Sequence, residues 1–299
     1  MATELELRKR IRSVKNISKV TNALSAVSAS KARRAEKAVR ATRDYAGKAF
    51  EILNNLASQE GGNSHQLLAN RESMNRIALI LITGDRGLCG AYNTNVVRLA
   101  ENFVESADAP VDLIAIGRKG RDLMVRRGYN VEASFTGLPS PPRSMDILPI
   151  ARIATDDYLA GKYDSVFIAY TDFINLAKSV PTVKQLLPLK PLDLSGLAMA
   201  EHVSHVDAKA ASESSYTYEP DPQQLLDIIV PRFTEMQIFQ ALLEAIASEE
   251  SARFMAMQNA TDNANTLVDA LTLERNKVRQ TNITNEILDI VGGAEAMAK

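Results

Sequence analysis

Residues 4–57 carry the apolar periodicity of one long helix. From Glu4 to about Ala57 there is no proline and one glycine, Gly47, and apolar or small residues recur at alternating spacings of three and four. A helix of this length extends about 80 Å at 1.5 Å per residue, which exceeds a small domain, so we expect it to need a partner helix. The stripe runs through Ile11, Val14, Ile17, Val20, Leu24 and Val27 and, after a polar break at Lys31 and Arg34, one position out of phase through Ala35, Ala38, Thr42, Tyr45, Ala49, Ile52 and Leu56.

Residues 223 to about 291 provide that partner. The range has no glycine and one proline, Pro231, which we expect to break or kink the helix near its start because proline lacks an N–H. Gly292 and Gly293 are expected to end the helix. Spacings of three and four continue through Leu243, Ile246, Glu250, Arg253, Met257, Ala260, Ala264, Leu267 and Leu271, and then through Ile283, Ile287 and Val291. The two ends of the chain are therefore predicted to form an antiparallel coiled coil.

The polar breaks suggest a register for this coiled coil. Matching Lys31 and Arg34 with residues 276–280 pairs positions whose numbers sum to roughly 303. Val20 would then face Ile283, Ala38 would face Ala264 and Tyr45 would lie near Met257. In that register, cysteines at positions 38 and 264 are expected to crosslink.

The middle of the chain alternates between strand and helix patterns. Strands are predicted at 77–83, 111–116, 129–135 and 165–170, and helices at 94–105, 118–126 and 145–160. This alternation predicts a small, doubly wound parallel sheet of Rossmann-like α/β type, with 175–187 as an edge strand that tolerates Pro181. The expected division is a long helix over 1–58, the α/β domain over 75–195, a polar loop over 196–222 and a long helix over 223–299.

Composition excludes several classes of protein. Hydrophobic residues make up 45% of the chain, and its longest apolar stretch, Ile77 to Thr83, is far shorter than the roughly 20 residues that span a bilayer. Membrane contact is therefore expected only through partners. The start of the chain runs directly into helical pattern, which favours the cytoplasmic side of a cell or a mature form. A net charge of −1 argues against nucleic acid as the main partner.

The most site-like motif follows the first predicted strand. Residues 83–90 read Thr-Gly-Asp-Arg-Gly-Leu-Cys-Gly, where α/β folds place phosphate-binding loops. The motif matches neither nucleotide-binding fingerprint, so a structural turn is the preferred interpretation and nucleotide binding the alternative. Cys89, the single cysteine, is expected to be a small buried side chain rather than a reactive thiolate.

No catalytic, cofactor or metal site is expected. His202 and His205 have a spacing that suits a metal only on a helix, and they lie in a loop-like stretch, so a solvated loop is preferred. His65 stands alone among polar residues, and no nucleophile–base set or carboxylate pair can be assigned.

The first helix is strongly basic between Arg8 and Arg43. Three interpretations fit this charge: a solvated face, a nucleic-acid contact, or an electrostatic surface against an acidic protein ring. Composition alone favours the solvated face. The basic residues are Arg8, Lys9, Arg10, Arg12, Lys15, Lys19, Lys31, Arg33, Arg34, Lys37, Arg40 and Arg43.

Sequence motifs near both ends and in the middle resemble one family. Residues 11–24 read Ile-Arg-Ser-Val-Lys-Asn-Ile-Ser-Lys-Val-Thr-Asn-Ala-Leu, and residues 28–34 read Ser-Ala-Ser-Lys-Ala-Arg-Arg. Together with residues 83–93, 252–264 and 276–287, they resemble the gamma subunit of F-type ATP synthases over essentially the whole chain. In that family the coiled coil is a central shaft that rotates inside a hexamer of alternating alpha and beta subunits.

The resemblance implies partners and contact residues. The α/β domain would rest on the membrane rotor ring of c subunits beside the epsilon subunit, on the cytoplasmic side of a bacterial plasma membrane. Arg279, Gln280 and Thr284 would contact a beta-subunit loop, as the family's corresponding motif does. The tip, Leu288 to Met297, would turn in an apolar sleeve, with Leu288, Ile290, Val291 and Met297 as its bearing residues. Tyr216, Tyr218 and Glu219 would lie in the foot loop that faces the ring and epsilon.

Two departures and two alternatives qualify this interpretation. The family often has methionine where Leu24 stands, near the contact with the beta subunit, and the similar volumes predict little effect. The paired-cysteine insertion of chloroplast forms is absent, so thiol control is not expected. The alternatives to a rotary shaft are a nucleotide-dependent α/β enzyme decorated with helices and a static coiled-coil scaffold.

Overall fold

The computed structural model describes residues 3–57, 65–69, 71, 74–189 and 222–297. Its contacts divide the chain into two compact units, one of residues 1–28 with 254–299 and the other of residues 29–253. Both long helices pass from one unit into the other. The elements are α1 (Glu4–Ala57), β1 (Ile77–Ile82), α2 (Tyr92–Ser106), β2 (Val111–Ile116), α3 (Arg118–Arg126), β3 (Val131–Phe135), α4 (Ser144–Leu159), β4 (Ser165–Asn175), β5 (Lys178–Leu187) and α5 (Pro222–Met297).

The unit of residues 29–253 contains a five-stranded sheet in the order β3-β2-β1-β4-β5. β1 pairs in parallel with β2 and with β4, and β2 pairs in parallel with β3. β5 is an antiparallel edge strand, in which Pro181 lies opposite Thr171. The predicted Rossmann-like α/β class, the alternation of strands with helices and the edge position of Pro181 are all confirmed.

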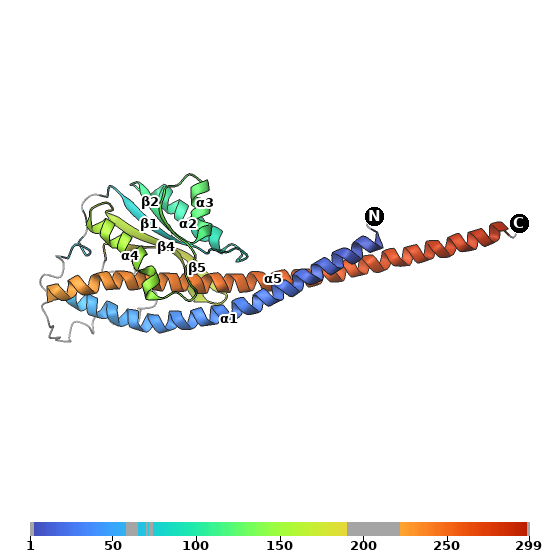
Figure 1. Cartoon of the computed structure of the whole chain (residues 1–299), viewed down its shortest axis with the longest axis horizontal. Helices are drawn as coiled ribbons and strands as arrows, with labels where there is room; N and C mark the ends of the chain where they lie inside the picture. The colour runs from blue at the N-terminus through green and yellow to red at the C-terminus, as the bar shows by residue number, and fades with distance from the viewer. Residues whose placement is uncertain (1–2, 58–64, 70, 72–73, 190–221, 298–299) are drawn as a thin grey trace. The chain divides into compact units, whose positions relative to one another are not determined.

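Helices cover both faces of this sheet (Figure 1). On one face α2 and α3 pack over the alternate positions Leu79, Leu81 and Leu113. On the other face α4 packs together with parts of α1 and α5 over Ala78, Ile80 and Ile82. Because β1 has burial on both sides, its six residues Ile-Ala-Leu-Ile-Leu-Ile are continuously apolar.

A capping box begins α1. The backbone N–H of Glu6 donates to Thr3 Oγ1 at 3.3 Å, and the backbone N–H of Thr3 donates to Glu6 Oε2 at 3.0 Å. Reciprocal bonds of this kind satisfy N–H groups that the first turn of a helix leaves free. α5 begins with Pro222 at its first position, where the missing N–H costs no helical bond.

The paired surface of α1 differs from the predicted stripe. Its buried or half-buried positions alternate by three and four residues without interruption through Leu7, Ile11, Val14, Ser18, Thr21, Ser25, Ser28, Ala32, Ala35, Val39, Thr42, Ala46, Ala49 and Leu53. Ile17, Val20 and Val27, which the sequence analysis placed on the buried stripe, are each more than half exposed. The predicted phase break at Lys31 and Arg34 is therefore also wrong, since one heptad pattern runs through it.

The register of the helix pair also differs from the predicted one. In the unit of residues 1–28 and 254–299, the Oγ1 atoms of Thr21 and Thr261 are 2.7 Å apart, and Ser18 Oγ donates to Asn265 Oδ1 at 2.8 Å. In the other unit, Lys31 Nζ lies 3.9 Å from Glu250 Oε1. These pairs have residue numbers that sum to about 282. The helices are antiparallel as predicted, but the predicted pairings of Val20 with Ile283, of Ala38 with Ala264 and of Tyr45 with Met257 are wrong.

The difference between the predicted and the observed register has a physical explanation. The two registers differ by about 21 residues, which is three heptads, and a shift by whole heptads keeps the same helix faces in contact. Apolar periodicity therefore cannot separate them. Polar pairs across the seam distinguish the observed register instead, because Thr21 meets Thr261 and Ser18 bonds to Asn265 in it.

Two expectations about α5 are also corrected. Helix α5 continues through Gly292 and Gly293 to Met297, and both glycines keep the negative φ that a helix requires. Each glycine costs a helix only about 1 kcal/mol relative to alanine, which does not end it. Pro231 lies inside α5, which is helical on both sides of it, so the expected break does not occur. The four-part division of the chain made from the sequence stays a prediction.

The register yields a crosslinking prediction. In a Cys89→Ala background, Thr21→Cys with Thr261→Cys is expected to form an intrachain disulfide on mild oxidation, because the parent hydroxyls are 2.7 Å apart. Val20→Cys with Ile283→Cys is the matched control in the other register and is expected to stay reduced. Mobility on a non-reducing gel distinguishes the two, and crosslinking of the control pair alone would contradict the register.

Candidate functional site

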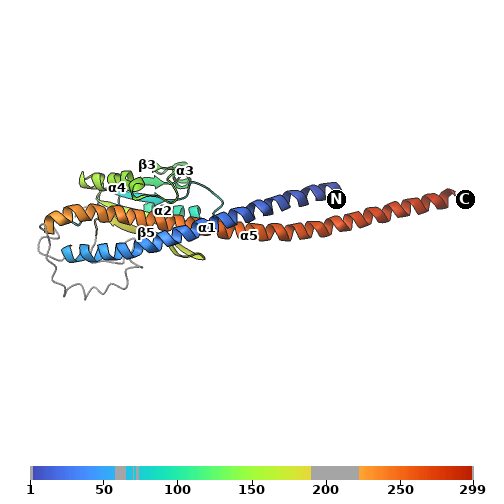
Figure 2. The same cartoon turned by 60° about the horizontal axis from the view of Figure 1, so that its bottom comes forward.

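The last five turns of α5 have no helix opposite them within the described part of their unit. The seam of α5 in this unit runs from the buried Met257 and Ala264 to the half-buried Val278, and every described side chain after Val278 is exposed. This end follows from the register, since position 278 lies opposite Glu4, where α1 begins. In Figures 1 and 2 the helix carrying the C-terminus continues past the start of α1.

Three of the four predicted contact residues lie at this transition, since Arg279, Gln280 and Thr284 are exposed on α5. Leu24 is half-buried on α1 and lies opposite about residue 258 in the observed register, so it is not beside Arg279. Thr284 Oγ1 donates to the backbone carbonyl of Gln280 at 2.9 Å, so this hydroxyl is satisfied within its own helix. Arg279 and Gln280 lie one turn before Thr284, so all three residues are available to a partner on one stretch of helix.

Apolar side chains dominate the segment beyond it. Ile290 is 71% exposed and Met297 is 91% exposed, and Ile283, Ile287, Leu288 and Val291 are also exposed. Ile17, Val20 and Val27 add exposed apolar side chains on α1 in the same unit. Exposed apolar residues gathered in one segment, as at the end of α5, are typical of a surface that a partner covers.

The predicted foot residues Tyr216, Tyr218 and Glu219 lie outside the described residues, as do His202 and His205. Among the residues that are described, no group of three or more His, Cys, Asp or Glu side chains has an arrangement that suits a metal ion. His65 lies with Nε2 3.5 Å from Asp227 Oδ1 on α5, a contact that sequence pattern did not reveal. Burial lowers the pKa of His65, and the charge of Asp227 partly opposes this.

The polar groups of the loop of residues 83–90 form hydrogen bonds with neighbouring parts of the chain. Asp85 accepts the backbone N–H of Arg118 at 2.9 Å and that of Gly137 at 2.8 Å. Thr83 Oγ1 accepts the N–H of Gly120 at 2.9 Å, and Asn93 Oδ1 accepts that of Gly84 at 2.8 Å. The loop therefore joins β1 to the neighbouring turns, which favours the structural interpretation over a phosphate-binding one.

The turn at Gly117 lies very close to the backbone of Thr83. Gly117, between β2 and α3, has φ +94°, and a Cβ there would lie 2.1 Å from the carbonyl oxygen of Thr83. Only glycine fits that position. Cys89 is buried as expected, and burial is the main cause that raises the pKa of its thiol, so it is not an activated nucleophile.

Charged residues of α5 close over this loop. A Cβ on Gly84 would lie 2.6 Å from Glu249 Oε1, so that carboxylate sits directly against the loop backbone. Arg253 forms ion pairs with Glu249 and, at 2.9 Å, with Glu250, and its Nε donates to the carbonyl of Gly87 at 3.4 Å. The carboxyl end of β1, where the strand order reverses, is the place where doubly wound folds bind nucleotides. Here the carboxyl group of Glu249 lies against the loop backbone, which disfavours a phosphate at this place.

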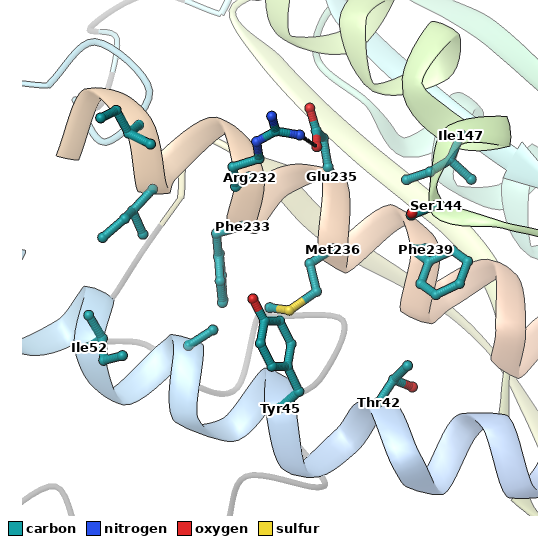
Figure 3. Close-up of a pocket in the computed structure, with 13 residues that line it drawn as sticks. Thr42, Tyr45, Ile52, Ser144, Ile147, Arg232, Phe233, Glu235, Met236 and Phe239 are labelled. Atoms are coloured by element: carbon teal, nitrogen blue, oxygen red, sulfur yellow. Dashed lines mark hydrogen bonds and ion pairs between the residues drawn. The ribbon is translucent and has the colours of Figure 1, made fainter. Parts of the chain in front are cut away.

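An apolar cavity of about 530 Å³ lies between α1, α4 and α5 in the unit of residues 29–253. Figure 3 shows Tyr45 of α1 pointing toward Phe233 and Met236 of α5. Among the described residues that line it, the one cation is Arg232, whose Nη1 is 3.0 Å from Glu235 Oε2. A lining with so little free positive charge does not suit a nucleotide.

Comparison with known proteins agrees with these features. The ATP synthase family model matches residues 3–297. An ATP synthase gamma chain of Roseiflexus castenholzii is 44% identical, and one of Dehalococcoides mccartyi is 42% identical, each over 100% of both chains. The chain belongs to the family of ATP synthase gamma chains.

Solved structures of ATP synthases contain chains that share the fold of this chain. A chain in the OSCP/F1/c-ring structure of the Euglena gracilis mitochondrial ATP synthase superimposes with a TM-score of 0.66 at 18% identity, covering 97% of this chain and 93% of that one. A chain of the Tetrahymena thermophila central stalk and c-ring structure gives 0.57 at 21% identity, over 81% and 99%. Within the residues that the structure describes, none of this chain's helices is both long and apolar enough to cross a membrane.

The sequence analysis missed the Glu249–Arg253–Glu250 ion pairs. Arg253 and Glu250 were read as positions of the apolar stripe, although charged residues at seam spacing already indicate a buried charge cluster. That signal is present in the printed sequence. The contact with the loop of residues 83–90 is not, because it depends on how α5 packs on the sheet.

Removal of Arg253 is expected to destabilise the chain. Arg253→Gln leaves two largely buried carboxylates with less positive charge beside them, and losing one partner of a buried ion pair costs about 3–5 kcal/mol. Arg232→Gln removes one partner of an exposed pair and is expected to cost less than about 1 kcal/mol. Urea unfolding followed by circular dichroism measures both, and equal small losses would show that the Arg253 cluster is not a buried one.

Proposed function

We propose that this chain is the central shaft of an F-type ATP synthase and carries rotation between a membrane ring and the alpha/beta hexamer. Membership of the gamma-chain family supports this role. The observation that carries it is the C-terminal end of α5, which is helical, apolar and exposed after its pairing with α1 ends. A helix end of this kind needs a partner around it, and the hexamer provides one.

The contact with the beta subunit is proposed at Arg279, Gln280 and Thr284, and their exposure on adjacent turns of α5 supports this assignment. Leu24 is proposed as a separate contact with the beta subunit, because in the observed register it lies opposite about residue 258. A guanidinium and an amide offer directed hydrogen bonds to a beta-subunit loop, and hydrogen bonds that involve a charged group are worth about 1.5–3 kcal/mol. These residues would therefore respond to the conformation of each beta subunit in turn.

The tip is proposed to turn in an apolar sleeve. Leu288, Ile290, Val291 and Met297 present hydrocarbon and no side-chain hydrogen-bond donors. Contacts without directed bonds change little in energy as one surface turns against the other. The tip would thus act as a bearing, whereas the contacts of Arg279 and Gln280 with the beta subunits would depend on the rotation angle of the shaft.

The remaining assignments concern the opposite end of the shaft and the site of catalysis. We propose that the chain lacks a catalytic site, binds no cofactor of its own and leaves ATP turnover to the hexamer. The carboxylate of Glu249 at the carboxyl end of β1 supports this. Epsilon and the ring of c subunits would contact the α/β domain and the foot residues Tyr216, Tyr218 and Glu219. The complex would then lie at the cytoplasmic side of a bacterial plasma membrane.

The basic surface of α1 fits an electrostatic contact with the hexamer. Lys9, Arg10, Arg12, Lys15 and Lys19 are exposed, although the net charge of the whole chain is −1. A local cationic surface on a nearly neutral chain attracts acidic groups to that surface.

Charge reversal at Arg279 tests the shaft. Arg279→Glu is expected to lower ATP hydrolysis and ATP synthesis by the assembled complex at least about tenfold, because losing one hydrogen bond to a charged group costs about 1.5–3 kcal/mol. Arg98→Glu, an exposed charge reversal on α2, is the matched control and is expected to have no effect.

Both variants are assembled with the same companion subunits and compared at equal complex concentration. A static scaffold tolerates Arg279→Glu as it tolerates the control. Unchanged synthesis and hydrolysis in the Arg279→Glu complex would therefore remove the proposed contact.

A further inference from the structure

Two carboxyl groups are buried together where the long helices meet the sheet in the unit of residues 29–253. Glu244 of α5 is 0% exposed, and Asp172 of β4 is 3% exposed. Arg43 of α1 contacts both Glu244 and the backbone of Phe173, the residue after Asp172, and the charge of Asp172 raises the pKa of Glu244. Two carboxylates are both acceptors, so a hydrogen bond between these groups requires a proton on one of them.

Contacts around this pair join three elements. Gln240 Nε2 donates to Glu244 Oε1 at 2.7 Å, and Thr42 Oγ1 of α1 donates to the side-chain oxygen of Gln240. Arg43 Nη2 of α1 lies 3.5 Å from Glu244 Oε1 and donates to the carbonyl of Phe173 in β4 at 2.9 Å. The cluster therefore fastens α1 and α5 to the same strand.

The charges facing Glu244 do not balance if both acids ionise. Arg43 faces it from α1, Asp172 from β4 and the neutral Gln240 from its own helix, so one cation stands against two carboxyl groups. Burial is the main cause that raises the pKa of Glu244, to about 8, and the neighbouring Asp172 raises it further, while Gln240 and Arg43 act in the opposite direction.

We propose that Asp172 and Glu244 share one proton in the folded chain and form a pH-sensitive latch that holds α1 and α5 on β4. Below the alkaline range the shared proton makes the hydrogen bond between the two acids. When it is lost, two like charges remain in a buried site with one arginine, and the attachment of the helices to the strand weakens. The latch concerns the folded chain alone and goes beyond the rotary role.

The direction of the pH effect follows from proton binding. In the unfolded chain Glu244 ionises near its ordinary value of 4.5, whereas the folded chain keeps the proton up to a higher pH. Between the unfolded pKa of 4.5 and the folded pKa of about 8, the folded state binds one more proton than the unfolded state. The free energy of unfolding therefore falls as pH rises through this window. The opening equilibrium of this region is expected to increase about tenfold per pH unit in that window and then level off above the folded pKa.

Hydrogen exchange at different pH values, read by mass spectrometry on the full chain, measures this opening locally. Peptides covering β4 and the middle of α5 are compared after correction for the intrinsic pH dependence of amide exchange. Glu244→Gln keeps the shape of the side chain without a titrating proton and is expected to remove the extra pH dependence. Glu235→Gln, at the solvated pair with Arg232 on the same helix, is the matched control and is expected to behave as the parent chain.

A second measurement covers the case in which Glu244→Gln does not fold. The infrared carbonyl band of a protonated carboxylic acid is expected in the parent chain at neutral pH and is expected to disappear at alkaline pH. Its absence at neutral pH would overturn the shared proton. Equal pH dependence of exchange in Glu244→Gln and in the parent chain would overturn the latch.

Discussion

The antiparallel pairing of α1 with α5 is the interaction on which the rest of the molecule depends. One heptad seam joins the helices in both units, and the bond between Thr21 and Thr261 belongs to the same register as the contact of Lys31 with Glu250. A single long helix in water has little to stabilise it beyond its own hydrogen bonds, whereas a paired one buries a continuous stripe. The register also decides where pairing ends, and therefore which part of α5 is left for partners.

The seam of α1 consists largely of small residues, so several of its larger apolar side chains remain available to contact a partner. Because serine, threonine and alanine fill much of the α1 seam, Ile17, Val20 and Val27 lie outside it and remain exposed. On α5, Met257 and Ala264 are buried in the seam, whereas Ile287 and Leu288 are exposed because they lie beyond the end of the pairing with α1. In the proposed role, one set of residues holds the two helices together and the other contacts the hexamer. A seam of large residues would leave less apolar surface for that contact.

Periodicity predicted the elements well and their pairing poorly. The bounds of α1, of β2 and of α3 follow from local pattern, and the parallel sheet follows from alternation of strand and helix. The register was wrong because heptad patterns repeat, and the stripe was wrong because bulky residues were taken as buried. The exposure of Arg279 and the apolar tip agrees with their proposed contacts. The acid pair of Asp172 with Glu244 lay beyond prediction, since it joins residues far apart in sequence.

Rotation of the chain within the assembled complex tests the account most directly. A bead is attached through Val125→Cys, at an exposed position of α3, in a Cys89→Ala background, while the alpha/beta hexamer is fixed to a surface and supplied with ATP. The account predicts that the bead turns stepwise in one direction as ATP is hydrolysed. Hydrolysis at the normal rate with a stationary bead would contradict it.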